Sequence, residues 1–467
     1  LFASEIKPLI KTNLIKKDIS YKALHHYTYF GASHSSETLF KNIKQIKPAE
    51  ILKFSGGKTS SKIYWNIENT SILNDDVKSI SSKIRFLMEK AVKEQLVSDV
   101  PVGVLLSGGV DSSIITAYAS KHYQGKIDTF SAGFDFDKGV NELPMARMVS
   151  NHFNTNHHEL VIKGHQLPNV LEDLIDHHGC PFADAANIPM YLISKELKGS
   201  LKVILQGDGG DEMFGGYRSY KLLKNYFFWN LASKFKYLLK GLPSGEKVKR
   251  LARILEIFSY EKEYIRMALL STTDTMDKSL FNLYKNDIQI KLSKTNPFYI
   301  FREKITGLNN FDMAHKMMAL DTLIQLPDVF LEKVDRASMA FGIESRVPFL
   351  ENNLSQFALS ISSNLKIRGR SGKWILKDSM KGVIPNAVLN ARKTGFGVPY
   401  SYWMSSSLYS YANDVFSTES FSSDSFFEKK KLFDMMLTHK KRPSIQTGYI
   451  LWKALNFAIW KNKLNEK

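Results

Sequence analysis

The sequence of 467 residues contains a single cysteine, Cys180. One cysteine cannot form a disulfide within the chain, supply a cysteine-rich zinc site or support a two-cysteine redox reaction. Long apolar runs are also missing, because no segment reaches the roughly 18 uninterrupted apolar residues that a membrane helix needs. The chain starts at Leu1, and no basic segment followed by an apolar one marks a signal peptide. These absences predict a cytoplasmic protein with no membrane partner.

Acidic residues are the scarcer charged class. The chain has 46 aspartate and glutamate residues against 64 lysine and arginine residues, which gives a formal net charge of +18. This excess makes nucleic acid, membrane surfaces and small anions candidate partners, but it does not choose among them. The 43% hydrophobic content is that of a globular protein, and the length indicates roughly two to three domains.

The middle of the chain alternates between strand-like and helix-like segments. Short apolar runs stand at 102–106, 128–134, 158–162 and 201–205. Helix-like stretches separate them at 112–123, 140–153 and 187–198. This alternation predicts an α/β fold with a doubly wound parallel sheet.

The two flanks of this region have different patterns. Two short runs around Gly56 and Gly57 predict a β-hairpin near the front of the chain. After about residue 220 amphipathic helical patterns dominate, as at 220–239, 312–326 and 449–464. The polar, turn-like stretch 67–77 is a candidate boundary. We therefore expect a β-rich segment at 1–66 and a second domain at 67–467 with a largely helical C-terminal half.

The segment Ser107–Ser113 reads Ser-Gly-Gly-Val-Asp-Ser-Ser and lies between an apolar strand and a helix. Glycines allow the backbone to turn tightly and to approach a phosphate, and a helix start presents unpaired N–H groups to an anion. Asp111 is a natural magnesium ligand, because that cation takes carboxylate oxygens together with substrate phosphates. A serine-capped glycine turn is the structural alternative. The full segment at a strand end favours a phosphate-binding loop.

A second glycine-rich segment, Gln206–Tyr217, also follows an apolar strand. It carries Asp208 and Asp211, which could hold a cation together with Asp111 from the neighbouring strand end. A solvated acidic turn is the alternative. Ligands of open α/β sheets bind at the carboxyl ends of adjacent strands, so we expect these two loops to meet.

These motifs resemble those of a known family. Ser107–Ser113 is similar to the pyrophosphate loop of the N-type ATP pyrophosphatases, and 206–217 resembles the second signature of the glutamine-hydrolysing asparagine synthetases. The resemblance continues through 331–340, 344–351, 372–377 and 392–399. Residues 1–10 resemble a late segment of the family's glutaminase domain, so 1–66 would be the end of that domain with its N-terminal cysteine missing. The fold implied for 67–467 is adenine nucleotide α-hydrolase-like.

The resemblance also implies roles for individual residues. ATP would be bound by Leu106, Ser107, Gly108, Gly109, Asp111, Ser112, Ala132, Gln206 and Gly207. Magnesium would be held by Asp111 and Asp211. The catalytic set would be Asp208, beside the reaction intermediate, together with Glu344 and Lys393. For Lys393 there is a separate reason, since a fixed cation beside a glycine-rich loop suits charge developing on a phosphate; a solvated surface pair with Arg392 is the alternative.

The activity implied is ATP-dependent synthesis of asparagine. Aspartate would be adenylated on its side chain, and ammonia would then displace AMP. ATP and Mg²⁺ are the implied cofactors, aspartate and ammonia the implied partners, and nucleic acid is not expected. We expect no glutamine hydrolysis without the missing cysteine, and we leave open whether the chain forms a homodimer. The alternatives are an amide-forming enzyme that acts on another carboxylate, such as a sugar acid or a peptide, and a tRNA-modifying enzyme with the same loop.

Overall fold

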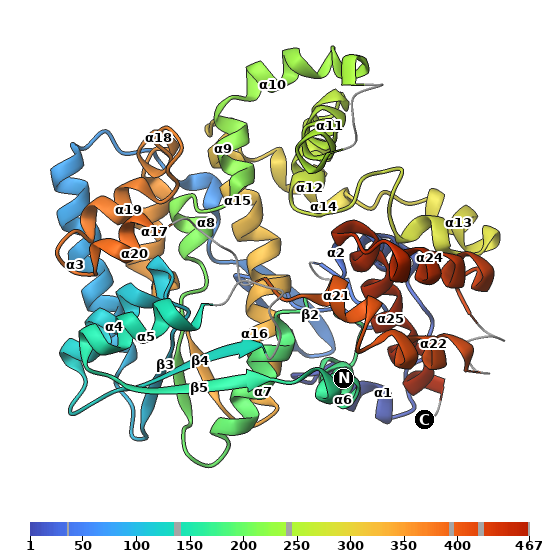
Figure 1. Ribbon diagram of the computed structural model, residues 1–467, viewed down its shortest axis with the longest axis horizontal. Helices are drawn as coiled ribbons and strands as arrows, with labels where there is room; N and C mark the ends of the chain where they lie inside the picture. Colours follow the sequence, from blue (N-terminus) through green and yellow to red (C-terminus); the bar gives the residue numbers. More distant parts are fainter. Residues whose placement is uncertain (35–36, 135–141, 240–244, 392–396, 419–424, 466–467) are drawn as a thin grey trace.

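A computed structural model describes residues 1–34, 37–134, 142–239, 245–391, 397–418 and 425–465. Its central feature is a parallel sheet with strand order β5-β4-β3-β6-β7 (Figure 1). The strands are β3 (Val102–Leu105), β4 (Asp128–Phe134), β5 (Asn156–Ile162), β6 (Val203–Leu205) and β7 (Glu344–Arg346). The predicted parallel sheet is confirmed, and β7 is an additional edge strand that the sequence pattern did not indicate.

Helices cover both faces of this sheet. One face packs against α3 (Val77–Gln95), α4 (Val110–His122) and α5 (Leu143–Phe153), and the other against α6 (Leu167–His178), α7 (Asn187–Leu197) and α16 (Glu332–Met339). Side chains of one strand alternate between the two cores, so Val203 and Leu205 enter one while Ile204 enters the other. A strand buried on both faces reads as an uninterrupted apolar run, which is why the sequence predicted β3 and β6 correctly.

The N-terminal segment is less β-rich than expected. It contains α1 (Ile6–Lys11), α2 (Tyr21–Phe30) and one antiparallel hairpin of β1 (Glu50–Ser55) and β2 (Lys58–Ile63). Helix α2 is buried, and the hydroxyl of Tyr27 donates a 2.8 Å hydrogen bond to the carbonyl of Lys453 near the other end of the chain. The segment is therefore joined to the rest of the molecule through α2.

The remainder of the chain is mostly helical, as predicted. Its helices are α8 (Gly210–Phe214), α9 (Arg218–Lys224), α10 (Tyr226–Ser233), α11 (Glu246–Ser259), α12 (Glu263–Leu270), α13 (Asn286–Ser293), α14 (Tyr299–Ile305), α15 (Met313–Leu323), α17 (Asn352–Ser360), α18 (Ser363–Lys366), α19 (Trp374–Ser379), α20 (Asn386–Asn390), α21 (Tyr400–Ser405), α22 (Tyr409–Ser417), α24 (Lys429–Lys441) and α25 (Ile445–Asn465). Short 3₁₀ turns lie at Ile67–Asn69, Gly164–Gln166, Lys236–Leu239, Leu280–Leu283 and Pro348–Leu350, and a π-helical turn at Leu326–Leu331 joins α15 to α16. Within the described ranges no helix combines the length and the apolar character needed to cross a bilayer.

Candidate active site

The two predicted loops meet at the carboxyl edge of the sheet. Strands β3 and β6 are hydrogen-bonded neighbours in parallel register, with Val104 opposite Leu205, so the segments that follow them leave the sheet side by side. A Cβ atom added to Gly207 would lie only 2.9 Å from the Cβ of Asp111. The glycine therefore allows the second loop to approach the first, and the predicted neighbourhood of the two loops is confirmed.

The loop after β3 is preorganised at the start of α4. Gly108 has φ of +73°, in the left-handed region that favours glycine, and any Cβ there would meet the backbone of Ala146 at 2.7 Å. The hydroxyl of Ser112 accepts a 3.2 Å hydrogen bond from the backbone N–H of Ser107. Gly109 caps α4 and contributes no side-chain hydrogen bond to its first turn. The helix start thus keeps N–H groups available for an anion.

Two carboxylates and a lysine form the charged centre of the site. The Nζ atom of Lys373 lies 2.6 Å from Oδ1 of Asp211 and is also ion-paired and hydrogen-bonded to Oδ2 of Asp111. Burial alone would lower the pKa of Lys373, but the two carboxylates outweigh it and hold that pKa above its usual value. Asp111 and Asp211 therefore converge on a single cation, although they come from loops about 100 residues apart in sequence.

A second acidic group lies beside this centre. Burial raises the pKa of Asp208; Lys333 opposes the shift, and the nearby carboxylate of Asp184 adds to it. Lys333 extends from α16, and its Nζ lies 3.3 Å from Oδ2 of Asp184. Burial would lower the pKa of Lys333, yet Asp184 and Asp208 raise it. Asp208 is thus a buried carboxylate with a raised pKa beside the cation of Lys333.

The remaining predicted nucleotide-binding residues surround the end of β3. The backbone N–H of Leu106 donates to the carbonyl of Phe130 at 2.8 Å, and the carbonyl of Leu106 accepts from the hydroxyl of Ser131. Ala132 is 8% exposed on β4. The amide nitrogen of the Gln206 side chain is buried and has no hydrogen-bond partner within the part of the chain that the structure describes. This donor is placed to receive an acceptor from a ligand.

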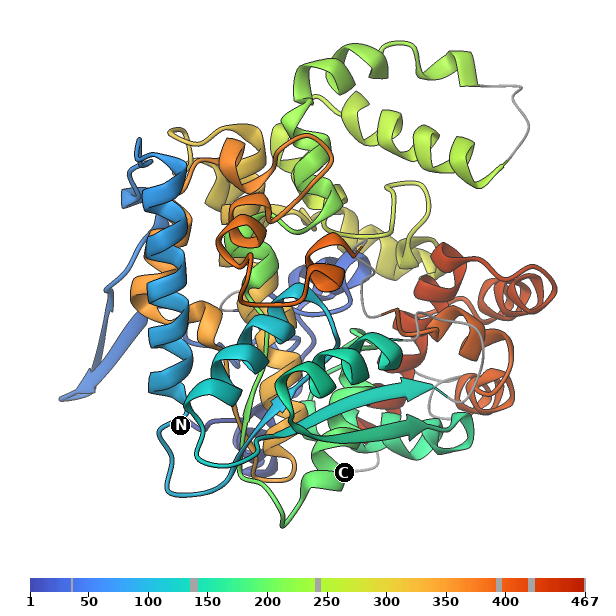
Figure 2. The same ribbon diagram turned by 60° about the vertical axis from the view of Figure 1, so that its left-hand side comes forward.

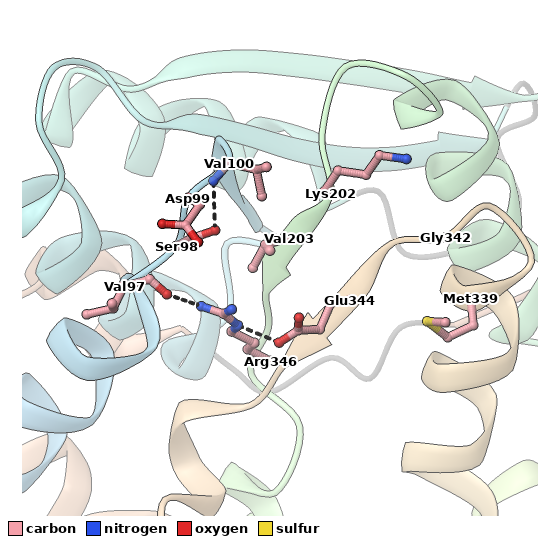
Figure 3. A pocket seen from close by; sticks show the side chains of 10 residues that line it. All are labelled: Val97, Ser98, Asp99, Val100, Lys202, Val203, Met339, Gly342, Glu344 and Arg346. Atoms are coloured by element: carbon pink, nitrogen blue, oxygen red, sulfur yellow. Dashed lines mark hydrogen bonds and ion pairs between the residues drawn. The ribbon is translucent and has the colours of Figure 1, made fainter. Parts of the chain in front are cut away.

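Glu344 lies elsewhere. It begins β7 opposite Val203, the first residue of β6, and so stands at the amino edge of the sheet, away from the loops that follow β3 and β6. It faces Arg346 in a pocket lined also by Val97, where Nε of Arg346 donates to its carboxylate at 2.7 Å (Figure 3). The structure therefore does not bring Glu344 to the charged centre, because Glu344 is the first residue of β7 and the charged loops follow the last residues of β3 and β6.

Comparison with known proteins places this arrangement in a family. The asparagine synthase family matches residues 83–462, and a glutamine amidotransferase domain matches residues 1–65. The chain belongs to the asparagine synthase family. The boundary at residue 66 stays a prediction. Within the family match lie both loops, Lys333 and Lys373.

Three relatives are between 24% and 28% identical to this chain over the aligned residues. Asparagine synthetase 1 of Bacillus subtilis is 28% identical over all of this chain and 72% of its own length. Asparagine synthetase B of Escherichia coli is 25% identical over 78% of this chain and 53% of its own length. An enzyme named an amidase in Penicillium rubens is 24% identical over 79% of this chain. The chain thus spans between about half and three quarters of these relatives.

Among solved structures, the U34-tRNA thiolase of Methanococcus maripaludis is 13% identical. The match covers 58% of this chain and 91% of that one, with a TM-score of 0.23. A similarity of this size carries no argument about fold or function.

The sequence predicted no role for three residues near the charged centre. One residue that it did predict, Lys393, lies outside the described residues. Lys373 lies in 372–377, one of the segments that resemble the family, but it had no predicted role; its signal was a Gly-Lys pair before a short helix. Lys333 and Asp184 had no local signal, because their relation to Asp208 arises only when α16 packs against the sheet.

The carboxylates fit the magnesium that the family implies. No group of three or more histidine, cysteine, aspartate or glutamate side chains gathers into a metal site in the described ranges. Mg²⁺ is commonly held by one or two carboxylates while water and substrate phosphates complete its shell. Asp111 and Asp211 supply such a pair, and their shared contact with Lys373 demonstrates that both reach one cation. When bound, the metal would neutralise charge on the phosphates.

Proposed function

We propose that this protein is an ATP-dependent amide-forming ligase that activates the side-chain carboxylate of aspartate and transfers it to ammonia. The observation that supports this most directly is the convergence of Asp111 and Asp211 on Lys373 beside the uncapped start of α4. That arrangement offers two kinds of cationic contact to a polyphosphate and a carboxylate pair for a metal. It suits a nucleotide whose pyrophosphate leaves.

In the first step a carboxylate oxygen of aspartate attacks the α-phosphorus of ATP. The new O–P bond gives β-aspartyl-AMP, and the bond to the bridging oxygen breaks to release pyrophosphate. The N–H groups at the start of α4 and the ammonium of Lys373 would hold the leaving pyrophosphate, since fixed donors stabilise developing charge without reorganising. Lys393 would add a further cation to the same phosphates.

In the second step the nitrogen of ammonia attacks the activated carbonyl carbon, and the C–O bond to AMP breaks. A proton must leave the nitrogen as the amide forms. Asp208 is the group we assign beside this reaction, because burial raises its pKa and Lys333 partly compensates. The activation is needed because an unmodified carboxylate has a poor leaving group, whereas AMP leaves readily.

The test is the release of AMP and pyrophosphate from ATP in the presence of aspartate, ammonium and Mg²⁺. Asp211→Asn should lower this turnover by at least about 100-fold, because it removes one charge of the carboxylate pair at the site. Asp99→Asn is the matched control, since Asp99 is exposed at the opposite edge of the sheet. Full turnover in a folded Asp211→Asn variant would show that the assignment is wrong.

A second candidate acts on a different carboxylic acid by the same two steps. One relative, which is 24% identical over 79% of this chain, is named an amidase and not an asparagine synthetase. Proteins with a different named activity can therefore resemble most of this chain. The same assay with aspartate replaced by sugar acids or by peptides bearing a free carboxylate distinguishes the two. Turnover that is independent of aspartate and saturates with another acid would favour the second candidate.

The source of ammonia is a separate question. Residues 1–65 match a glutamine amidotransferase domain, a type of domain that releases ammonia from glutamine. The same assay with ammonium and with glutamine as the nitrogen source would show which of the two supports turnover.

A further inference from the structure

Helices α10 and α11 form a hairpin that projects from the body of the molecule (Figure 2). Its inner side is well packed. The ring of Phe258 in α11 lies 5.8 Å from that of Tyr226 and 6.4 Å from that of Trp229, both in α10. Ser233 is buried and donates to the carbonyls of Asn230 and Phe258. These contacts fix which side of α10 faces outwards.

The side of α10 that faces away from α11 is apolar and uncovered. We call Phe227, Phe228 and Leu231 of α10, together with Phe235 in the turn that follows it, the outer face of α10. The exposed fractions of these residues are 85%, 62%, 58% and 57%. Phe227 and Leu231 are spaced four residues apart, which puts them on one side of α10, and Phe235 follows in the turn after the helix. Four large, exposed apolar side chains within 227–235 are a concentration of a kind that soluble proteins usually cover.

Exposed cations lie on the same hairpin. Lys234 is exposed between Leu231 and Phe235 in the sequence, and Lys247, Lys249 and Arg250 are exposed on the first turns of α11. Lys236 lies over the ring of Tyr237, which is itself 63% exposed. Among the described side chains of 226–237 and 247–260 the one acidic group is Glu256, which is partly buried beside Arg253. The projecting hairpin therefore carries a strongly positive charge around an aromatic surface.

From this combination we propose that the hairpin docks on an anionic phospholipid bilayer. Exposed aromatic and leucine side chains flanked by lysine and arginine are the composition of helices that lie in the membrane interface. The apolar side chains would enter the acyl boundary while the cations contact lipid phosphates. The proposal departs from the sequence-based expectation of no membrane partner and concerns binding to a surface, not a spanning segment.

A second copy of the chain is the competing occupant, and charge argues against it. A two-fold contact through the outer face would bring the positively charged hairpin of one copy towards that of the other. Like charges at close range oppose such a contact. The chain termini are also remote, since both lie at the opposite end of the molecule from this hairpin in the two ribbon views (Figures 1 and 2).

The experiment is co-sedimentation of the full chain with vesicles of phosphatidylcholine alone and with vesicles of phosphatidylcholine and phosphatidylglycerol in equal parts. We expect binding to the anionic vesicles, weak binding to the neutral ones, and release when salt is raised, because screening weakens the lipid–lysine contacts. Failure to bind anionic vesicles at low salt overturns the proposal.

Two variants separate the apolar and the charged contributions. The double variant Phe227→Gln/Leu231→Gln should bind anionic vesicles at least about tenfold more weakly, because each removed side chain would have been buried in the interface. Lys247→Glu/Lys249→Glu should lose the preference for anionic lipid. Phe86→Gln, at a 65% exposed position on α3, is the control for the apolar variant, and Lys53→Glu/Lys62→Glu is the control for the charge variant.

Adenylation activity and thermal unfolding should be unchanged in all four variants, since none lies in the proposed active site. Equal vesicle binding by the Phe227→Gln/Leu231→Gln variant and the parent chain would contradict the proposal. So would concentration-dependent self-association that the apolar variant abolishes while vesicle binding is absent from the parent chain. In that case the outer face is an interface between copies.

Discussion

The ammonium of Lys373 lies 2.6 Å from the Oδ1 atom of Asp211, and it also contacts Asp111. A lysine from the C-terminal half of the chain thus ties together two loops of the central sheet. Lys373 is only 6% exposed, so its charge is compensated almost entirely by these two carboxylates. Removing one partner of such a buried group leaves uncompensated charge, which is more costly than never having had the pair.

The first prediction concerns that lysine. Lys373→Met should lower the free energy of unfolding by about 3–5 kcal/mol without divalent cations, because two partly buried carboxylates then lose their ion pairs with Lys373. Mg²⁺ should restore a larger part of the stability in the variant than in the parent chain, since the two carboxylates then lack the positive charge of Lys373 and gain more from a bound cation. Thermal unfolding with and without Mg²⁺ measures both effects.

Lys90→Met is the matched control for this prediction. Lys90 forms an exposed pair with Glu94 at 3.7 Å on α3, and loss of such a pair costs at most about 1 kcal/mol. An Mg²⁺ response in Lys373→Met that is no larger than in the Lys90→Met control would argue against a shared cation position.

A second prediction tests the close approach of the loops. Gly207→Ala should reduce adenylation by at least about tenfold, because its Cβ would lie 2.9 Å from the Cβ of Asp111 and 3.3 Å from the N–H of Ser112. The loop after β6 and the loop after β3 would have to move apart, which would displace the groups that hold the pyrophosphate. Gly245→Ala is the control, since a Cβ there meets no atom within 4 Å and its φ of −70° suits any residue. Equal activity of the two variants would show that the loops tolerate separation.

How much of this could be read from the sequence depends on how local each signal was. The strands around Val104 and Ile204 were predictable because burial on both faces makes them uniformly apolar. The meeting of Asp111 with Asp211 followed from the rule for parallel strand ends. The role of Lys373 did not, because nothing in its neighbourhood shows which distant loop it will reach. The position of Glu344 was missed because its three-residue strand has no apolar pattern.

The third prediction uses a buried aspartate behind the site. Asp321 accepts hydrogen bonds from the hydroxyls of Tyr220 and Ser271, and burial raises its pKa from 3.8 to about 7. A raised pKa favours the protonated form in the folded state, so the folded chain loses stability as pH rises from about 4 to about 7. Asp321→Asn should flatten this part of the stability profile and gain at most about 4 kcal/mol at neutral pH.

Chemical denaturation across that pH range measures the effect, with Asp99→Asn as the exposed control. Glu142 and Glu212 also have raised pKa values, of about 7 and about 8, so the slope should shrink and not vanish. An unchanged slope in Asp321→Asn would mean that its carboxyl group is not what makes stability depend on pH.

The last prediction concerns Lys366, which is fully buried beneath the turn at Gly215. Its Nζ finds no hydrogen-bond partner among the described residues, and burial lowers its pKa from 10.5 to about 7, with Asp312 acting in the opposite direction. A lowered pKa means that the folded state disfavours the ammonium, so stability is lost as pH falls from about 10.5 towards about 7. Lys366→Met keeps the aliphatic volume and removes the ionisable group.

The variant should therefore gain about 2–4 kcal/mol of unfolding free energy near pH 6, and the gain should shrink steadily towards pH 10. The neighbouring imidazole of His315 has a pKa lowered by burial and by Lys366, to about 3, so this shift should relax once Lys366 is replaced. Lys93→Met, at an exposed position on α3, should show neither change. A gain in Lys366→Met that does not vary with pH would arise from packing alone, and it would contradict a lysine held neutral in the core.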